Sequence, residues 1–241
     1  MKLMVVKDYE QVSLAVADCF AQMLQAKPNA VLGLATGTTP LRAYEILVEQ
    51  CQKGELSFSQ VTTFNLDEYR GLSADSPASY RYFMNEHLFS HIDIDKQKTY
   101  IPEGSNLNSA QACAAYDRLL AEFGPIDMQL LGIGRNGHIG FNEPSDAFSQ
   151  DTHCVDLTES TIEANSRLFA RQSDVPRQAY TMGVKSIMQA RRIVLAASGE
   201  DKAQAVQNAV QGPIKPQCPA SALQLHRHCT IIADEAAAAL L

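Results

Sequence analysis

The sequence predicts an α/β fold: a doubly wound, mostly parallel sheet of modified Rossmann-like type, with helices on both faces. Short apolar runs bounded by turn residues alternate with amphipathic segments, which is the pattern of parallel strands and crossover helices. The runs are almost continuously apolar, as strands buried on both faces are. The composition, 46% apolar and 20% charged, is that of an ordinary globular protein. No Pro/Gly/Ser-rich linker interrupts the chain, so we expect a single domain over residues 1–241.

Hydrophobic periodicity gives the elements of the first half. Apolar residues three and four positions apart predict a helix over 12–24, and the apolar run 30–35 predicts a buried strand. A second helix is expected to start at Pro40, since proline suits a first helical turn. The same criteria predict a strand over 61–65, a helix over 80–89 and a short strand at 100–101.

The second half continues the alternation. Asn108 suits the N-cap of a helix that Gly124 and Pro125 would end. The later elements are predicted as strands over 126–132, 192–198 and 230–233, a helix over 202–210, and an Ala-rich helix that closes the chain. The polar segment around 150–177 breaks the rhythm, and we expect it to be a helical lid outside the sheet.

Charge and cysteine content exclude several classes of function. The net charge is −7 and no basic run exists, so nucleic acid is not an expected partner. No apolar run approaches the roughly 18 residues that a membrane span needs. The six cysteines form no C-x-x-C pair or zinc-finger spacing. They fit reduced, buried thiols, and we expect a cytoplasmic protein without a metal site.

Ligands of such sheets bind outside the carboxyl ends of the strands, which directs attention to the residues that follow each strand. After the first predicted strand comes a loop of small residues, Thr36, Gly37, Thr38 and Thr39, that leads into a helix. Its backbone N–H groups, its hydroxyls and the helix dipole could cradle a phosphate. A tight strand-to-helix turn is the equally simple alternative.

Two adjacent carboxylates, Asp67 and Glu68, follow the second strand. Adjacent side chains on an extended backbone point in opposite directions. We therefore expect one of them to face the ligand cleft and the other to make a structural hydrogen bond. The alternative is that both are solvated loop residues, as adjacent acidic residues in loops usually are.

The most informative segment is 132–144, GIGRNGHIGFNEP, which follows the strand over 126–132. Its glycines allow close approach of the backbone to a ligand. His138 offers a proton-transfer group, and Glu143 offers a carboxylate that could fix its tautomer and raise its basicity. A core histidine in a Gly-rich turn is the alternative.

Taken together, these segments resemble the glucosamine-6-phosphate deaminases of the glucosamine/galactosamine-6-phosphate isomerase family, in their short form. The resemblance covers nearly the whole chain. It rests on LGLATGTTP (32–40), TFNLDEY (63–69), GIGRNGHIGFNEP (132–144), ANSR (164–167), AYTMG (179–183) and SALQLH (221–226). It implies conversion of glucosamine 6-phosphate to fructose 6-phosphate and ammonium in amino-sugar catabolism, without a metal or organic cofactor.

The resemblance also implies roles for individual residues. Asp67 would be the base that moves the proton from C2 to C1, and His138 would open the sugar ring with Glu143 as its partner. Asn136 stands where longer members of the family carry Asp, so Glu143 would bear more of the orienting role. The 6-phosphate would be held by Thr36, Gly37, Thr38, Thr39, Arg167 and Lys202.

Two other functions fit the same sheet. A 6-phosphogluconolactonase-like hydrolase would share the phosphate loop and the Gly-His turn, but the Phe-Asn-Glu-Pro run over 141–144 favours the deaminase. A non-catalytic sugar-phosphate sensor is the second alternative, since fold does not fix function. The expected partner is therefore a small sugar phosphate. The sequence leaves a monomer and a small homo-oligomer equally open.

Overall fold

The computed structural model describes residues 1–241 except 167–168, 170 and 172–173. Its centre is a seven-stranded sheet in the order β1-β10-β9-β6-β2-β3-β5, and every neighbouring pair is parallel. The predicted parallel α/β fold is therefore confirmed. The strands, in sheet order, are β1 (Lys2–Val6), β10 (Cys229–Asp234), β9 (Ile193–Ala197), β6 (Met128–Leu131), β2 (Val31–Leu34), β3 (Thr62–Asn65) and β5 (Thr99–Tyr100).

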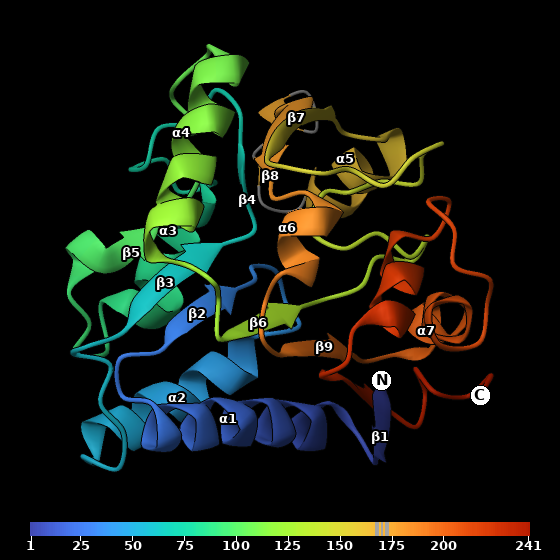
Figure 1. Cartoon of the computed structure of the whole chain (residues 1–241), viewed down its shortest axis with the longest axis horizontal. Coiled ribbons are helices and arrows are strands. Elements are labelled where there is room, and N and C mark those ends of the chain that lie inside the picture. Colours follow the sequence, from blue (N-terminus) through green and yellow to red (C-terminus); the bar gives the residue numbers. More distant parts are fainter. Residues whose placement is uncertain (167–168, 170, 172–173) are drawn as a thin grey trace.

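Helices cover both faces of this sheet (Figure 1). The long helices α1 (Tyr9–Ala26) and α2 (Leu41–Gln52) run along one face, whereas α4 (Ser109–Phe123) and α6 (Val184–Met188) lie on the other side. Side chains cap two of them as N-caps should: Asp8 accepts a hydrogen bond at the start of α1, and Asn108 does the same for α4. The described residues also form α3 (Tyr80–Met84), a π-helical turn over Asn85–Phe89, α5 (Glu159–Asn165) and α7 (Ala203–Val210), with short 3-10 helices at Lys96–Lys98, Glu200–Lys202 and Pro219–Leu225.

A small antiparallel sheet, which the sequence did not predict, lies beside the large one. It consists of β4 (Asp67–Tyr69), β8 (Gln178–Thr181) and β7 (His153–Asp156) in that order. The chain passes from β3 into β4 through Leu66. The N–H of Leu66 donates to the Leu34 carbonyl at 3.2 Å, and its carbonyl accepts from the Met182 N–H at 2.7 Å. Leu66 thus joins the two sheets, and Asp67 is the first residue beyond that junction.

Several expected elements differ from the observed ones. The prediction of an Ala-rich closing helix is wrong: residues 235–240 form turns, because the segment is too short to propagate a helix even though the Asp234 carboxylate accepts from the Ala237 N–H as an N-cap would. Pro40 is the N-cap of α2 rather than its first residue. The segment around 150–177 is not wholly helical, since it contains β7 as well as α5.

The strand order sets the place of a ligand site. From β2 the sheet continues through β3 and β5 on one side, and through β6, β9 and β10 on the other. The connections after β2 and β6 therefore leave in opposite directions from two neighbouring strands. That reversal opens a crevice at the carboxyl ends of the strands, which is where ligands bind in such folds.

Candidate active site

A cavity of about 670 Å³ lies at this crevice. Its volume is in the range of small-molecule sites. The walls come from the residues that follow β2, β3, β6 and β9, together with side chains of α3 and α5. The sequence-predicted residues that line it are Thr36, Gly37, Thr38, Thr39, Asp67, Asn136, His138 and Lys202. Residues far apart in the chain are thus brought together at one edge of the sheet.

Asp67 and Glu68 face opposite sides of β4, as their adjacency predicted. Asp67 lines the large cavity, whereas Glu68 lines a separate, smaller one. Both side chains are buried rather than solvated. Burial, and to a smaller extent the neighbouring charge of Glu68, together raise the pKa of Asp67 from its ordinary value to about 8. Asp67 is therefore a carboxyl group that can take up a proton near neutral pH.

His138 and Glu143 form a pair on the loop that follows β6. The Nδ1 atom of His138 lies 3.4 Å from Oε2 of Glu143, which is an ion-pair distance but too long for a well-aligned hydrogen bond. Asn136 lies between them: its side-chain N–H donates to Oε2 of Glu143 at 2.7 Å, and its Oδ1 accepts from the backbone N–H of His138 at 3.1 Å. The three side chains form one connected group.

Helix α5 supplies two further partners for Glu143. The hydroxyl of Thr161 donates to Oε1 of Glu143 at 2.5 Å, and the hydroxyl of Thr158, the N-cap of α5, donates to the same oxygen at 3.3 Å. Burial opposes ionisation of Glu143, but His138, Thr161 and Asn136 outweigh it and lower the pKa of Glu143 to about 2. Glu143 is thus a permanent anion beside His138.

Gly134 lets the histidine ring lie against the backbone. A Cβ atom on this residue would fall 2.3 Å from Cε1 of His138, a distance that no pair of non-bonded carbons adopts. The turn is closed by hydrogen bonds from the Gly134 N–H to the His138 carbonyl and from the Gly137 N–H to the Gly134 carbonyl, each 2.9 Å long. The glycines of this segment therefore serve to place the imidazole.

The same cavity carries the groups expected to hold a phosphate. The loop 36–39 turns through Gly37, whose φ of +95° is costly for any other residue. Lys202 reaches the cavity from the segment before α7, and its Nζ lies 3.6 Å from the Asp201 carboxylate. Asp201 also accepts a hydrogen bond from Arg135 at 2.8 Å. Arg167, the sixth expected phosphate ligand, lies outside the described residues.

Sequence reasoning missed several side chains of the cavity. Tyr80, Arg135, Thr161 and Ser198 all line it. Ser198 could have been found from the sequence, because it is the last residue of the predicted strand over 192–198 and so lies at the carboxyl end of a strand, where ligands bind. Tyr80 and Thr161 lie in the first turns of helices, and only the packing of those helices brings them to the sheet edge.

Within the described ranges, His, Cys, Asp and Glu side chains do not gather in groups of three or more that could bind a metal ion. None of the described helices is long and apolar enough to cross a bilayer. All six cysteines are free thiols.

Comparison with known proteins agrees with this geometry. The sequence profile described as "Glucosamine-6-phosphate isomerases/6-phosphogluconolactonase" matches residues 8–232. The glucosamine-6-phosphate deaminase of Clostridium perfringens is 52% identical over 241 residues, covering all of both chains. That of Rhodopirellula baltica is also 52% identical and covers all of this chain and 96% of the relative.

Solved structures show the same fold. A structure described as a monomeric glucosamine-6-phosphate deaminase of the NagB superfamily has a TM-score of 0.97 at 46% identity, over the full length of both chains. The 6-phosphogluconolactonase from Leishmania guyanensis has a TM-score of 0.77 at 19% identity, covering 98% of this chain and 97% of the other, which shows a shared fold alone. The chain therefore belongs to the glucosamine-6-phosphate isomerase/6-phosphogluconolactonase family.

Proposed function

We propose that the protein is a glucosamine-6-phosphate deaminase, which converts glucosamine 6-phosphate to fructose 6-phosphate and ammonia in amino-sugar catabolism. The observation that carries this proposal is the meeting of a buried base, Asp67, and an anion-paired imidazole, His138, on one cavity. An aldose-to-ketose conversion needs both groups: one to open the ring and one to move a proton between neighbouring carbons. The high identity of full-length deaminases supports the choice of substrate.

Ring opening is the task of His138. The step moves a proton from the anomeric hydroxyl to the ring oxygen, and an imidazole titrates in the pH range where such a transfer is efficient. Glu143 stabilises the protonated ring of His138 by its charge, and Asn136 holds the carboxylate in place. The product of this step is the open-chain aldehyde.

Proton transfer is the task of Asp67. Its carboxylate removes the C2 proton, which leaves an enolamine, and returns that proton to C1. The resulting imine at C2 is hydrolysed by water to the ketone of fructose 6-phosphate and ammonia. Because burial raises the pKa of Asp67 to about 8, the ionised base becomes the major form only as the pH rises through that value. A buried carboxylate is a stronger base than a solvated one, which suits a weakly acidic C–H bond.

The 6-phosphate is held by the loop 36–39 and Lys202 of the same cavity, together with Arg167. Backbone N–H groups and hydroxyls of 36–39, the Lys202 ammonium and the side chain of Arg167 bind it, because oriented N–H groups and cations are what a phosphate dianion requires. These groups anchor the substrate so that C1 and C2 lie near Asp67. Thr161 and Glu163 of α5 also line the cavity, which supports a lid role for the segment around 150–177.

The direct test is to incubate the purified protein with glucosamine 6-phosphate and to measure ammonium and fructose 6-phosphate together. Equal amounts of both products are expected, and glucose 6-phosphate serves as a control that cannot release ammonium. A protein that instead hydrolyses 6-phosphogluconolactone and releases no ammonium would be a lactonase. Binding of glucosamine 6-phosphate without turnover would identify a sensor.

The working form of the enzyme is a cytoplasmic monomer. A monomeric state is supported by the 46%-identical solved structure, which is described as a monomeric deaminase. Sedimentation equilibrium should then give the mass of one chain, 26.4 kDa. The free thiols of all six cysteines fit a reducing compartment.

A further inference from the structure

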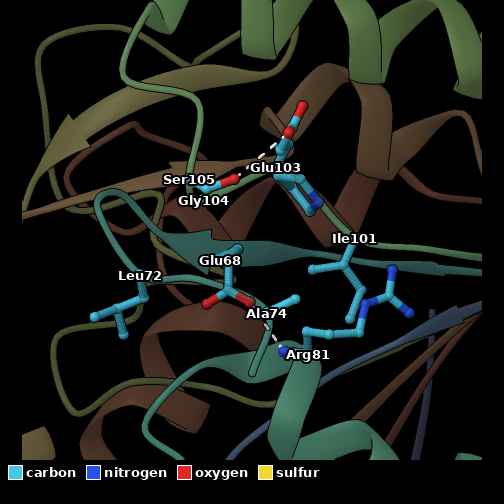
Figure 2. A pocket seen from close by; sticks show the side chains of 9 residues that line it. Glu68, Leu72, Ala74, Arg81, Ile101, Glu103, Gly104 and Ser105 are labelled. Carbon is cyan, nitrogen blue, oxygen red and sulfur yellow. Dashed lines mark hydrogen bonds between the residues drawn. The ribbon is translucent and has the colours of Figure 1, made fainter. Parts of the chain in front are cut away.

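Glu68 directly follows the proposed base but does not touch its cavity. Figure 2 shows its carboxylate in the smaller cavity, of about 140 Å³, with Arg81 on one side and the segment 101–105 above it. Glu68 is 3% exposed. A buried carboxylate is costly unless it is fully hydrogen-bonded, so its partners indicate what it does.

The partners of Glu68 are backbone N–H groups. Oε1 accepts from Tyr69 at 2.8 Å and from Tyr80 at 2.9 Å, and Oε2 accepts from Arg81 at 2.9 Å. Tyr80 and Arg81 are the first two residues of α3, whose N-cap is Ser79. The Arg81 guanidinium donates in turn to the hydroxyl and carbonyl of Thr99 in β5. Glu68 therefore fixes the start of α3 against β4.

Tyr80, whose backbone N–H binds Glu68, also lines the large cavity. Its ring lines that cavity, stacks on Phe141 with 5.9 Å between ring centroids, and lies 4.9 Å from the ring of Tyr69. Its hydroxyl interacts with Thr36 of the expected phosphate loop. The backbone atom that Glu68 holds thus belongs to a residue that forms part of the substrate site.

We propose that Glu68 is a positioning residue of this enzyme: through the first turn of α3 it holds Tyr80 against the substrate cavity, which Asp67 also lines. The proposal rests on the deaminase function proposed above. It assigns a role to the second carboxylate of the Asp67-Glu68 pair, which the reaction itself does not use.

Among the described acidic groups near Asp67, Glu68 is the one that carries a negative charge. The titratable groups near Asp67 are its chain neighbour Glu68 on the opposite face of β4, Tyr80 from α3, Tyr116 from α4, and His138, which lines the same cavity. Burial raises the pKa of both tyrosines well above the ordinary value, so both stay neutral. Burial also raises the pKa of Glu68 to about 7, against the opposing effect of its three N–H donors. A charged Glu68 raises the pKa of Asp67.

The test compares Glu68→Gln with Glu103→Gln. Glutamine keeps the shape of Glu68 but removes the charge, and its NH₂ group cannot accept a hydrogen bond from α3. Glu103 lines the same small cavity, where its carboxylate accepts only a 3.4 Å hydrogen bond from Ser105, so it is a matched control. For Glu68→Gln we expect the acid limb of kcat/KM to move to lower pH by about 0.5 to 1 unit, because a like charge is removed. We also expect kcat to fall about tenfold, whereas Glu103→Gln should match the wild type in both.

The outcomes separate positioning from a purely structural role. A folded Glu68→Gln protein whose acid limb stays at the wild-type pH, with activity lost only in proportion to unfolded protein, would overturn the proposal. If Glu68→Gln fails to fold, Glu68→Asp decides the question: it retains the charge and shortens the reach, so kcat should fall while the acid limb stays in place. A shifted limb in Glu68→Asp contradicts the proposal. Wild-type protein that releases no ammonium contradicts the deaminase function instead.

Discussion

The carboxyl group of Asp67 is held in an environment that disfavours its charge. Burial raises its pKa from an ordinary 3.8 to about 8, so the folded protein binds a proton that the unfolded chain releases. The free energy of unfolding consequently falls as the pH rises between those two values. Catalytic groups often impose such a cost, because a base must be both reactive and shielded from water.

Asp67→Asn should therefore inactivate the enzyme and stabilise it. The amide keeps the shape but cannot accept the C2 proton, so kcat should fall by about 10² to 10⁴-fold. At about pH 9 the variant should be more stable than the wild type by at least about 1 kcal/mol, and the difference should shrink at about pH 5. Urea unfolding at both pH values and deuterium incorporation at C1 of the product are the measurements. Wild-type rates of deuterium incorporation would refute the role of Asp67.

His138→Gln should separate ring opening from proton transfer. The variant should lose most activity on cyclic glucosamine 6-phosphate, yet still exchange the C1 proton of fructose 6-phosphate in the presence of ammonium, since the ketose reaches its open chain more readily. Glu143→Gln should show the same pattern in milder form, because the imidazole remains but loses its anion. Unchanged thermal melting is the control. Equal loss of both activities in folded His138→Gln would exclude a ring-opening role.

Residues in sequence-local motifs could be predicted, whereas residues brought in by packing could not. The opposite orientations of Asp67 and Glu68 follow from strand geometry, and the pairing of His138 with Glu143 follows from one short loop. The burial of Glu68 could not be predicted from the sequence, because two of its three N–H donors belong to α3, which begins twelve residues later. Tyr80 was missed for the same reason.

At the scale of elements, α5 is attached to the catalytic loop through hydroxyl groups. Thr161 and Thr158 both donate to Oε1 of Glu143, so the first turn of α5 and the anion beside His138 form a single hydrogen-bonded unit. The orientation of the carboxylate therefore depends on the placement of that helix.

Thr161→Val tests this dependence with an isosteric change. Loss of a hydrogen bond to a charged group costs about 1.5 to 3 kcal/mol, so kcat should fall at least about tenfold while KM changes little. The pKa of Glu143 should rise from about 2, which carbon-13 NMR of labelled glutamate can follow. Thr161→Ser keeps the hydroxyl and is the control. Wild-type kcat in Thr161→Val would show that α5 does not orient Glu143.

Buried parallel strands and amphipathic helices could be predicted, but short or edge elements could not. The runs that became β2, β6, β9 and β10 are mostly apolar because both faces are covered. In contrast, β1 pairs with β10 alone, and β4 has only three residues, so neither has a distinct pattern. The alanines after Asp234 favour a helix locally, yet the segment is too short to propagate one.

At the scale of the whole molecule, the carboxyl ends and the amino ends of the parallel strands have different functions. The cavity lies at the carboxyl ends of the strands, whereas a buried carboxylate, Asp127, lies at the opposite edge. It accepts from Lys27 at 2.7 Å, from the Val31 N–H at 2.8 Å, and lies 3.4 Å from Nε of Arg191. One side chain thus links the end of α1 with the starts of β2, β6 and β9.

Asp127→Asn should destabilise the protein without affecting catalysis. Removing the charge leaves the hydrogen bonds to Lys27 and Val31 weakened, at a cost of about 1 to 3 kcal/mol in the free energy of unfolding. The values of kcat and KM, measured well below the unfolding temperature, should equal those of the wild type. The measurements are urea unfolding and steady-state kinetics. A changed kcat in folded Asp127→Asn would contradict the view that the amino ends of the strands contribute to stability and not to catalysis.

The pairing of β1 with β10 also bears on how the protein is made. Strand β1 pairs with a strand more than two hundred residues later in the chain, and such distant pairing delays folding. Strand β10 also ends in Asp234, which accepts hydrogen bonds from the Ser198 hydroxyl and the Gly199 N–H beside the proposed phosphate site. The nascent chain therefore cannot complete its active site before translation reaches Asp234, and an interrupted translation product should have no activity.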